Sequence, residues 1–178
     1  HVGTTAAYLL DNKQVTEKIS VVHHVGNGPD PYKRQLAPHT HYVGFTPDDK
    51  YLYAVDLGSD TIVLYFYEDG KLRVRSKHAV IAGSGPRHII FSKDGRFAYL
   101  LNEINNTIIV YAYKEAHFTM LQVISTLPRH FDGESSAAAI HLSSEGGHLF
   151  VSNRGHDSIA MYHVNQENGK LYLLYMVH

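Results

Sequence analysis

A segment of 21 residues occurs three times in this chain, and this repeat constrains the fold more than any other feature. The copies span residues 45–65, 91–111 and 142–162, and successive copies begin 46 and 51 residues apart. They read FTPDDKYLYAVDLGSDTIVLY, FSKDGRFAYLLNEINNTIIVY and LSSEGGHLFVSNRGHDSIAMY. A repeat of this length is typical of solenoids, propellers and arrays, in which each copy forms one structural unit.

Each copy is part of a longer repeat of about 40 residues, which contains the signals of four short strands joined by turns. In the first copy, Pro47-Asp48-Asp49-Lys50 predicts a tight turn, and the strand formers of 51–55 follow it. A polar corner at 56–60, a third run at 61–65, a second turn at 68–71 and a fourth run from Leu72 complete the pattern. The runs are apolar on both faces, which predicts strands buried on both sides, as in the stacked four-stranded antiparallel blades of an all-β propeller. A short solenoid of sheets is the alternative.

The repeat register also predicts the organisation of the chain. We expect a single β-propeller domain over 1–178, with a half blade at 1–40 and whole blades at 41–80, 87–127 and 138–178. Propellers close with about 4–8 blades. Three and a half blades cannot close a ring, so we expect this chain to be a fragment of a larger propeller, whose remaining blades come from the same polypeptide.

The amino-acid composition limits the classes of partner that we expect for this chain. The net charge is −1, 44% of the residues are hydrophobic, and no cysteine is present. A balanced charge predicts neither a nucleic acid nor a membrane as partner. The lack of cysteine fits a reducing compartment, so we expect a cytoplasmic protein. No motif in the chain indicates a cofactor.

Equivalent positions of the copies differ at two places. The start of the first strand holds in turn His41, Arg87 and Ala138. The corner after the second strand holds Leu57, Glu103 and Arg154, each preceded by a residue suited to capping the turn, namely Asp56, Asn102 and Asn153. The two places lie at the same edge of a blade, because the first two strands are antiparallel. We therefore expect His41, Arg87, Glu103 and Arg154 at one shared mouth, where they would form a catalytic or anion-binding site.

Each of these residues also has a structural interpretation. His41 could cap a strand that lines the channel, and Arg87 and Arg154 could tie blades together with Glu103 as their partner. The two interpretations are compatible, since a carboxylate held between two arginines would stay ionised. Such a group is a better electrostatic partner than proton carrier at neutral pH.

The links between blades add candidates for substrate binding. Two links, Gly26-Asn27-Gly28-Pro29 and Gly83-Ser84-Gly85-Pro86, can turn backbone N–H groups toward an anion. After the first link the chain inserts residues 30–40, and loops on a rigid scaffold often carry recognition. The candidate substrate-binding residues are Arg34, Gln35, His39, His88, Gly83 and Gly85.

A metal site is the next possibility, because the chain has 14 histidines. In an extended His39-Thr40-His41 segment, two imidazoles lie on one side. Two ligands do not make a zinc site, and no spacing fixes a third. We therefore expect no bound metal.

Several motifs in order along the chain resemble the lactonase propeller family. They are Arg34-Gln35-x-x-Pro38-His39-x-His41, Phe45-x-Pro47-Asp48, Asp56-Leu57-Gly58-x-Asp60, Gly83-Ser84-Gly85-Pro86-Arg87-His88, Leu101-Asn102-Glu103 and Ser152-Asn153-Arg154-Gly155-His156-Asp157-Ser158-Ile159. The family includes propeller-type 6-phosphogluconolactonases and fungal 3-carboxymuconate cyclases. The resemblance implies seven blades in a full-length member, and it places the active-site positions at His41, Arg87, Glu103 and Arg154.

The resemblance makes a lactone hydrolase the leading hypothesis, with a small anionic lactone as substrate. The arginines would hold a phosphate and the developing oxyanion, and His41 or Glu103 would activate water. The residues do not decide between these two bases. One alternative is a lactonizing cyclase whose arginines hold carboxylates. Another is a non-catalytic propeller that serves as a binding scaffold.

Overall fold

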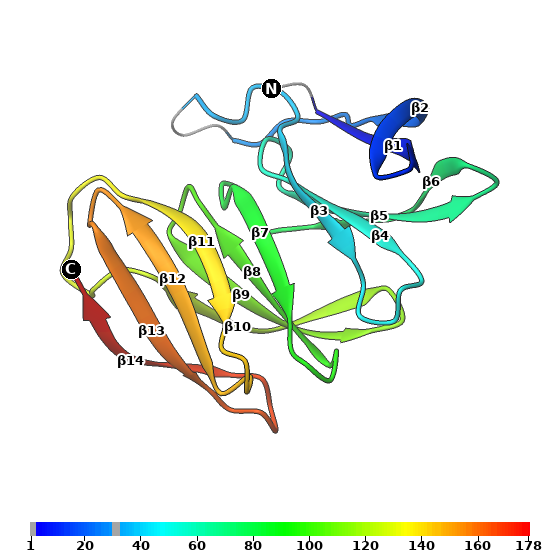
Figure 1. Ribbon diagram of the computed structural model, residues 1–178. Coiled ribbons are helices and arrows are strands. Elements are labelled where there is room, and N and C mark those ends of the chain that lie inside the picture. The colour runs from blue at the N-terminus through cyan, green and yellow to red at the C-terminus, as the bar shows by residue number, and fades with distance from the viewer. Residues whose placement is uncertain (1–2, 30–32) are drawn as a thin grey trace.

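The computed structural model describes residues 3–29 and 33–178, and in these ranges the chain forms strands, turns and loops without a helix (Figure 1). The first two strands are β1 (Thr4–Asp11) and β2 (Gln14–His23). The other twelve are β3 (Thr40–Phe45), β4 (Leu52–Asp56), β5 (Thr61–Glu68), β6 (Lys71–Ala79), β7 (Pro86–Phe91), β8 (Phe97–Asn102), β9 (Thr107–Lys114), β10 (His117–Ser125), β11 (Ser136–Leu142), β12 (His148–Arg154), β13 (Ser158–Val164) and β14 (Leu171–Val177).

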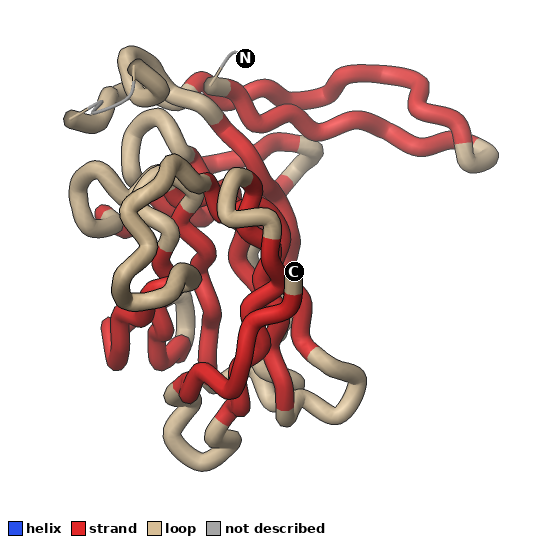
Figure 2. Tube along the Cα trace, turned by 90° about the vertical axis from the view of Figure 1, so that its left-hand side faces the viewer, coloured by secondary structure: helices blue, strands red, loops and turns tan. Residues whose placement is uncertain are grey.

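The strands form three four-stranded antiparallel sheets and one two-stranded sheet. Sheet 1 has the order β3-β4-β5-β6, sheet 2 the order β7-β8-β9-β10, and sheet 3 the order β11-β12-β13-β14. The pair β1-β2 forms a half sheet, whose hairpin projects away from the rest in Figure 2. The first strands are neighbours, because β7 contacts both β3 and β11. This arrangement confirms the predicted class, an all-β fold of four-stranded propeller blades.

Packing between sheets explains why the strand sequences are apolar on both faces. Every residue of β8 is buried. Ala98 and Leu100 join the core between sheets 1 and 2, whereas Phe97, Tyr99 and Leu101 join the core between sheets 2 and 3. Each fully buried leucine contributes about 1.5–3 kcal/mol relative to an exposed one. A strand between two neighbours therefore needs large apolar residues at every position.

Strand register brings the start of each first strand beside the end of each second strand. Thr40 pairs with Asp56 in sheet 1, Pro86 with Asn102 in sheet 2, and Ser136 with Arg154 in sheet 3. The residues just after these positions lie on the same edge of their sheets. Side chains from three sheets can thus meet at one end of the assembly.

No helix in the described ranges is long and apolar enough to cross a membrane. Residues 1–2 and 30–32 lie outside the described ranges, so the half blade predicted at 1–40 and the insertion predicted at 30–40 are described only in part.

Candidate functional site

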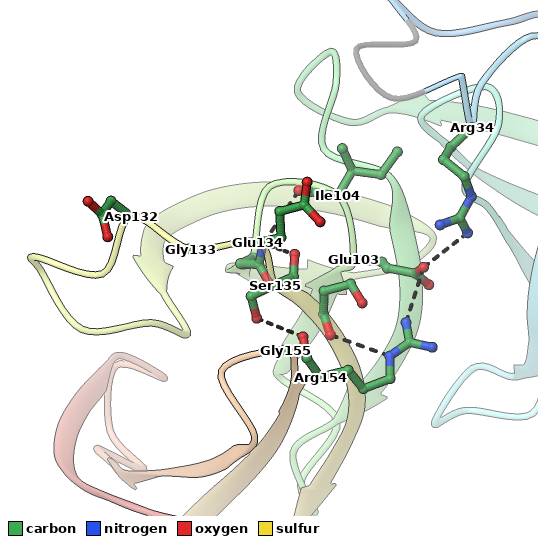
Figure 3. Close-up of a pocket in the computed structure, with 11 residues that line it drawn as sticks. Arg34, Glu103, Ile104, Asp132, Gly133, Glu134, Ser135, Arg154 and Gly155 are labelled. Carbon is green, nitrogen blue, oxygen red and sulfur yellow. Dashed lines mark hydrogen bonds and ion pairs between the residues drawn. The ribbon is translucent and has the colours of Figure 1, made fainter.

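Glu103 is the centre of the site and contacts three arginines from different parts of the chain. Its Oε1 atom lies 3.0 Å from Arg34 Nη2 and 3.1 Å from Arg154 Nη2, and its Oε2 atom accepts from Arg87 Nε at 2.8 Å. Figure 3 shows Arg34 and Arg154 approaching this carboxylate from different sides. Three guanidiniums around one carboxylate leave two positive charges in excess at this point, an arrangement that can attract an anion.

The carboxylate of Glu103 is ionised at neutral pH. Its side chain is only 4% exposed. Burial alone would raise the pKa of Glu103, but the hydrogen bond from Arg34 and the charges of the three guanidiniums together lower it below its usual value. A carboxylate held in this way is a weak proton acceptor, and it serves better to position the arginines.

Arg87 is fixed by partners in two sheets. Besides Glu103, its guanidinium donates to the carbonyl oxygen of Ala138, which lies on β11. The same Nη1 atom lies 3.1 Å from His88 Nε2, so that nitrogen accepts the hydrogen bond and carries no proton. Burial and the charge of Arg87 lower the pKa of His88 to about 4. His88 is therefore neutral at pH 7.

His41 lies in a group of three histidines beside the arginines. Its ring centroid is 5.4 Å from that of His88 and 6.0 Å from that of His39. Burial is the main cause that lowers the pKa of His41 below its usual value, and the positive charge of Arg87 lowers it further. The imidazole is thus neutral at pH 7 and able to accept a proton. The predicted residues His41, Arg87, Glu103 and Arg154 all lie at this mouth, as do His39 and His88.

Arg34 comes from the partly described link between β2 and β3, and the sequence did not indicate that it contacts Glu103. Its neighbour Gln35 is fully buried and donates from Nε2 to the carbonyl oxygen of Leu57 at 2.8 Å. Gln35 therefore holds the link against sheet 1. We leave it out of the proposed substrate contacts, although the sequence suggested it.

The glycine link before β7 binds an anion within the chain. The N–H groups of Gly83 and Gly85 donate to the Asp60 carboxylate at 2.7 and 2.8 Å. The expected nest of N–H groups is formed, but an aspartate of the preceding corner occupies it. We therefore leave Gly83 and Gly85 out of the proposed substrate contacts as well.

A cavity of about 680 Å³ extends from the arginines along the loop before β11. Its lining includes Arg34, Glu103 and Arg154, and also Asp132, Glu134 and Ser135 of that loop. Figure 3 places Arg34 and Asp132 on opposite sides. The sequence analysis did not identify this loop. The only available signal was the acidic pair in a link between blades, and charged link residues are usually solvated.

In the described ranges, no group of three or more histidine, aspartate or glutamate residues is arranged to hold a metal ion.

Comparison with known proteins identifies relatives over nearly the whole chain. The family profile described as "Lactonase, 7-bladed beta-propeller" matches residues 1–177. A 6-phosphogluconolactonase from Bacillus subtilis is 43% identical over 174 residues, which are 96% of this chain and 49% of that protein. This chain thus spans about half the length of that relative.

Solved structures agree with this relationship. A protein from Lactobacillus plantarum superposes with a TM-score of 0.93 at 36% identity, over 99% of this chain and 52% of that one. The periplasmic gluconolactonase of Pseudomonas aeruginosa superposes with a TM-score of 0.89 at 31% identity, over 98% of this chain and 50% of that one.

Proposed function

Because this chain belongs to the lactonase family of seven-bladed β-propellers, we propose that the protein that contains it hydrolyses a phosphorylated sugar lactone at the mouth described above. The relatives named 6-phosphogluconolactonase and gluconolactonase support lactone hydrolysis. The observation that carries the finer proposal is the cluster of three arginines on Glu103 beside a neutral histidine.

The arginines bind the anionic part of the substrate in this proposal. A guanidinium has five N–H donors, so the contacts with Glu103 leave donors for a second anion. The side chains of Arg34 and Arg154 are 43% and 53% exposed, so a ligand can reach them. A phosphate monoester carries up to two negative charges near neutral pH, which match the two excess positive charges.

His41 acts as the general base. It takes a proton from water while the water oxygen attacks the lactone carbonyl carbon, and a guanidinium stabilises the oxyanion that forms. The ring C–O bond then breaks, and the proton passes to the ring oxygen to give the open hydroxy acid. We assign this role to His41 because its lowered pKa leaves it neutral, whereas Glu103 is occupied by arginines.

The acidic loop favours a sugar lactone over the tricarboxylate substrate of a cyclase. Asp132 and Glu134 also line the cavity, and neither forms an ion pair among the described residues. Carboxylates accept hydrogen bonds from sugar hydroxyl groups and repel additional carboxylates. We therefore propose a substrate with one anionic group and a neutral, hydroxyl-rich body.

We also propose that the protein is located in the cytoplasm. The absence of cysteine from the sequence suits the cytoplasm, while one structural relative is named as periplasmic.

The test uses the intact protein and two substrates, 6-phosphogluconolactone and gluconolactone. We expect His41→Ala to lower kcat on both by about 10²–10⁴-fold, the usual contribution of a general base. Arg154→Ala should raise KM for the phosphorylated lactone far more than for the other. His117→Ala is the control, because this exposed histidine lies on β10. Wild-type kcat/KM in His41→Ala would overturn the assignment of the base.

A further inference from the structure

The link between the half sheet and sheet 1 is long, and it carries part of the proposed site. It runs from residue 24 to 39, whereas the links before β7 and β11 run over 80–85 and 126–135. Arg34 lies on it, and His41 follows two residues after its end. A longer link costs more conformational entropy to order. Contacts that restrain the two ends of this link therefore limit the positions that Arg34 can adopt.

One carboxylate holds both ends of this link. Asp56 Oδ2 lies 2.6 Å from His24 Nδ1, at the first residue of the link. Asp56 Oδ1 accepts from the backbone N–H of His39 at 2.8 Å, at the last residue. The side chains of His24 and Asp56 are 3% and 0% exposed. Buried, charge-assisted hydrogen bonds of this kind are among the strongest in proteins.

We call the group of Asp56, His24 and His39 the clasp. Further hydrogen bonds join the clasp to the half sheet and to sheet 1. On the far side of the ring, His24 Nε2 lies 2.6 Å from Tyr65 Oη and 3.1 Å from Thr5 Oγ1. Both ring nitrogens are therefore hydrogen-bonded, and the ring connects the half sheet to sheet 1. The clasp is thus anchored in two sheets.

The residue after Asp56 extends the contact toward Arg34. The backbone N–H of Leu57 donates to the carbonyl oxygen of His39 at 3.0 Å. The carbonyl oxygen of Leu57 accepts from Gln35 Nε2 at 2.8 Å. Gln35 is the chain neighbour of Arg34, so the corner that holds the link ends also fixes the residue beside the arginine.

The other two sheets provide an internal comparison. Asn102 and Asn153 occupy the position of Asp56. Asn153 Nδ2 donates to the carbonyl oxygen of Thr126, at the first residue of its link, and Asn102 Nδ2 donates to Thr107 within its own corner. Among the corresponding side chains of the three four-stranded sheets, the one that holds both ends of a link thus occurs at the longest link.

From these contacts we infer that Asp56 is a positioning residue for the site, which closes the link 24–39 and so delivers Arg34 to the anion-binding cluster. This inference rests on the proposed function of the arginines as an anion site. Asp56 does not touch the substrate in this arrangement, because it acts through the link.

The test measures the Kd for inorganic phosphate by calorimetry on the intact protein, with Asp56→Ala, Arg34→Ala and the double variant. Loss of one guanidinium contact should weaken phosphate binding by about tenfold. If Asp56 acts through Arg34, Asp56→Ala should cause a similar loss, and the double variant should bind no more weakly than either single variant. Effects that multiply, or wild-type affinity in Asp56→Ala, would overturn the inference.

Two further variants separate positioning from general destabilisation. Tyr65→Phe removes the hydroxyl group on the other side of His24 and leaves the contact between Asp56 and His39, so it should lower Tm without changing the phosphate Kd. If Asp56→Ala does not fold, Asp56→Asn replaces it, because asparagine still accepts from His39 N–H but presents an amide nitrogen in place of one carboxylate oxygen. It should weaken binding less, and again without an added effect of Arg34→Ala. A wild-type protein that binds no phosphate would also overturn the inference, whereas one that binds phosphate but hydrolyses no lactone overturns the proposed function alone.

Discussion

Replacement of Glu103 by glutamine tests whether this carboxylate holds the arginines together. Glutamine keeps the shape of the side chain but removes its charge. The ion pair with Arg87 is the most buried of the three, because the side chain of Arg87 is 17% exposed and that of Glu103 is 4% exposed. Its loss should therefore destabilise the protein most. Removing one partner of a buried ion pair costs about 3–5 kcal/mol. Arg34 and Arg154 are about half exposed, and each such pair adds about 0–1 kcal/mol at most.

The effect of Glu103→Gln on the unfolding free energy should also depend on pH. Burial raises the pKa of Glu103, but the arginines lower it by more, so the pKa of Glu103 is lower in the folded protein than its usual value. A carboxyl group with a lowered folded pKa stabilises the protein above its unfolded pKa of about 4.3. This stabilisation is lost as the pH falls through the folded value. The difference in unfolding free energy between wild type and Glu103→Gln should therefore be largest at pH 7 and shrink in acid.

Urea denaturation from pH 7 down to pH 3 measures this difference. Glu68→Gln is the control, because Glu68 is exposed and forms no ion pair in the described ranges, and it should behave as wild type. A difference below about 1 kcal/mol at pH 7, the scale of an exposed pair, would refute the view that Glu103 organises the cluster. So would a difference that stays constant over this pH range.

Three other outcomes follow from the structure. Because burial and Arg87 lower the pKa of His41, kcat/KM on the lactone should be constant near pH 7 and fall only below pH 6.5; a midpoint above 6.5 in the pH profile would contradict this. Glu134→Gln should raise KM for the sugar lactone and strengthen inhibition by citrate, and unchanged citrate inhibition would argue against a specificity role. Gly85→Ala should destabilise the protein by more than about 1 kcal/mol, because φ is +62° and a Cβ atom would clash with the side chain of Ile104; thermal unfolding checks this, and an unchanged Tm would contradict it.

The repeat predicted the fold because it encodes local structure. Turn residues such as Asp48 and Asp94 recur at fixed offsets, and their carboxylates accept from Thr46 and Ser92 in the folded chain. Such contacts join residues two apart, so a sequence can display them directly. The same register placed the candidate residues at one edge, because antiparallel pairing fixes which ends of neighbouring strands meet.

The contacts that define the site in detail join distant residues and could not be predicted in this way. Arg34 and Glu103 are 69 positions apart, and Arg34 comes from a link that is longer than its counterparts before β7 and β11. The glycines of the link before β7 suggested an anion site, yet they bind Asp60 of the same chain. Sequence indicates that N–H groups can converge on an anion, but it does not tell which carboxylate lies within reach.

Differences among equivalent positions explain how a repetitive scaffold supports an asymmetric site. The same place at the start of the first strand holds His41 in sheet 1, Arg87 in sheet 2 and Ala138 in sheet 3. Arg87 donates to the carbonyl oxygen of Ala138, a backbone group that every residue type supplies. Sheet 3 therefore contributes to the site through its backbone at this position, because this carbonyl oxygen helps to fix the Arg87 guanidinium, which also contacts Glu103 and His88.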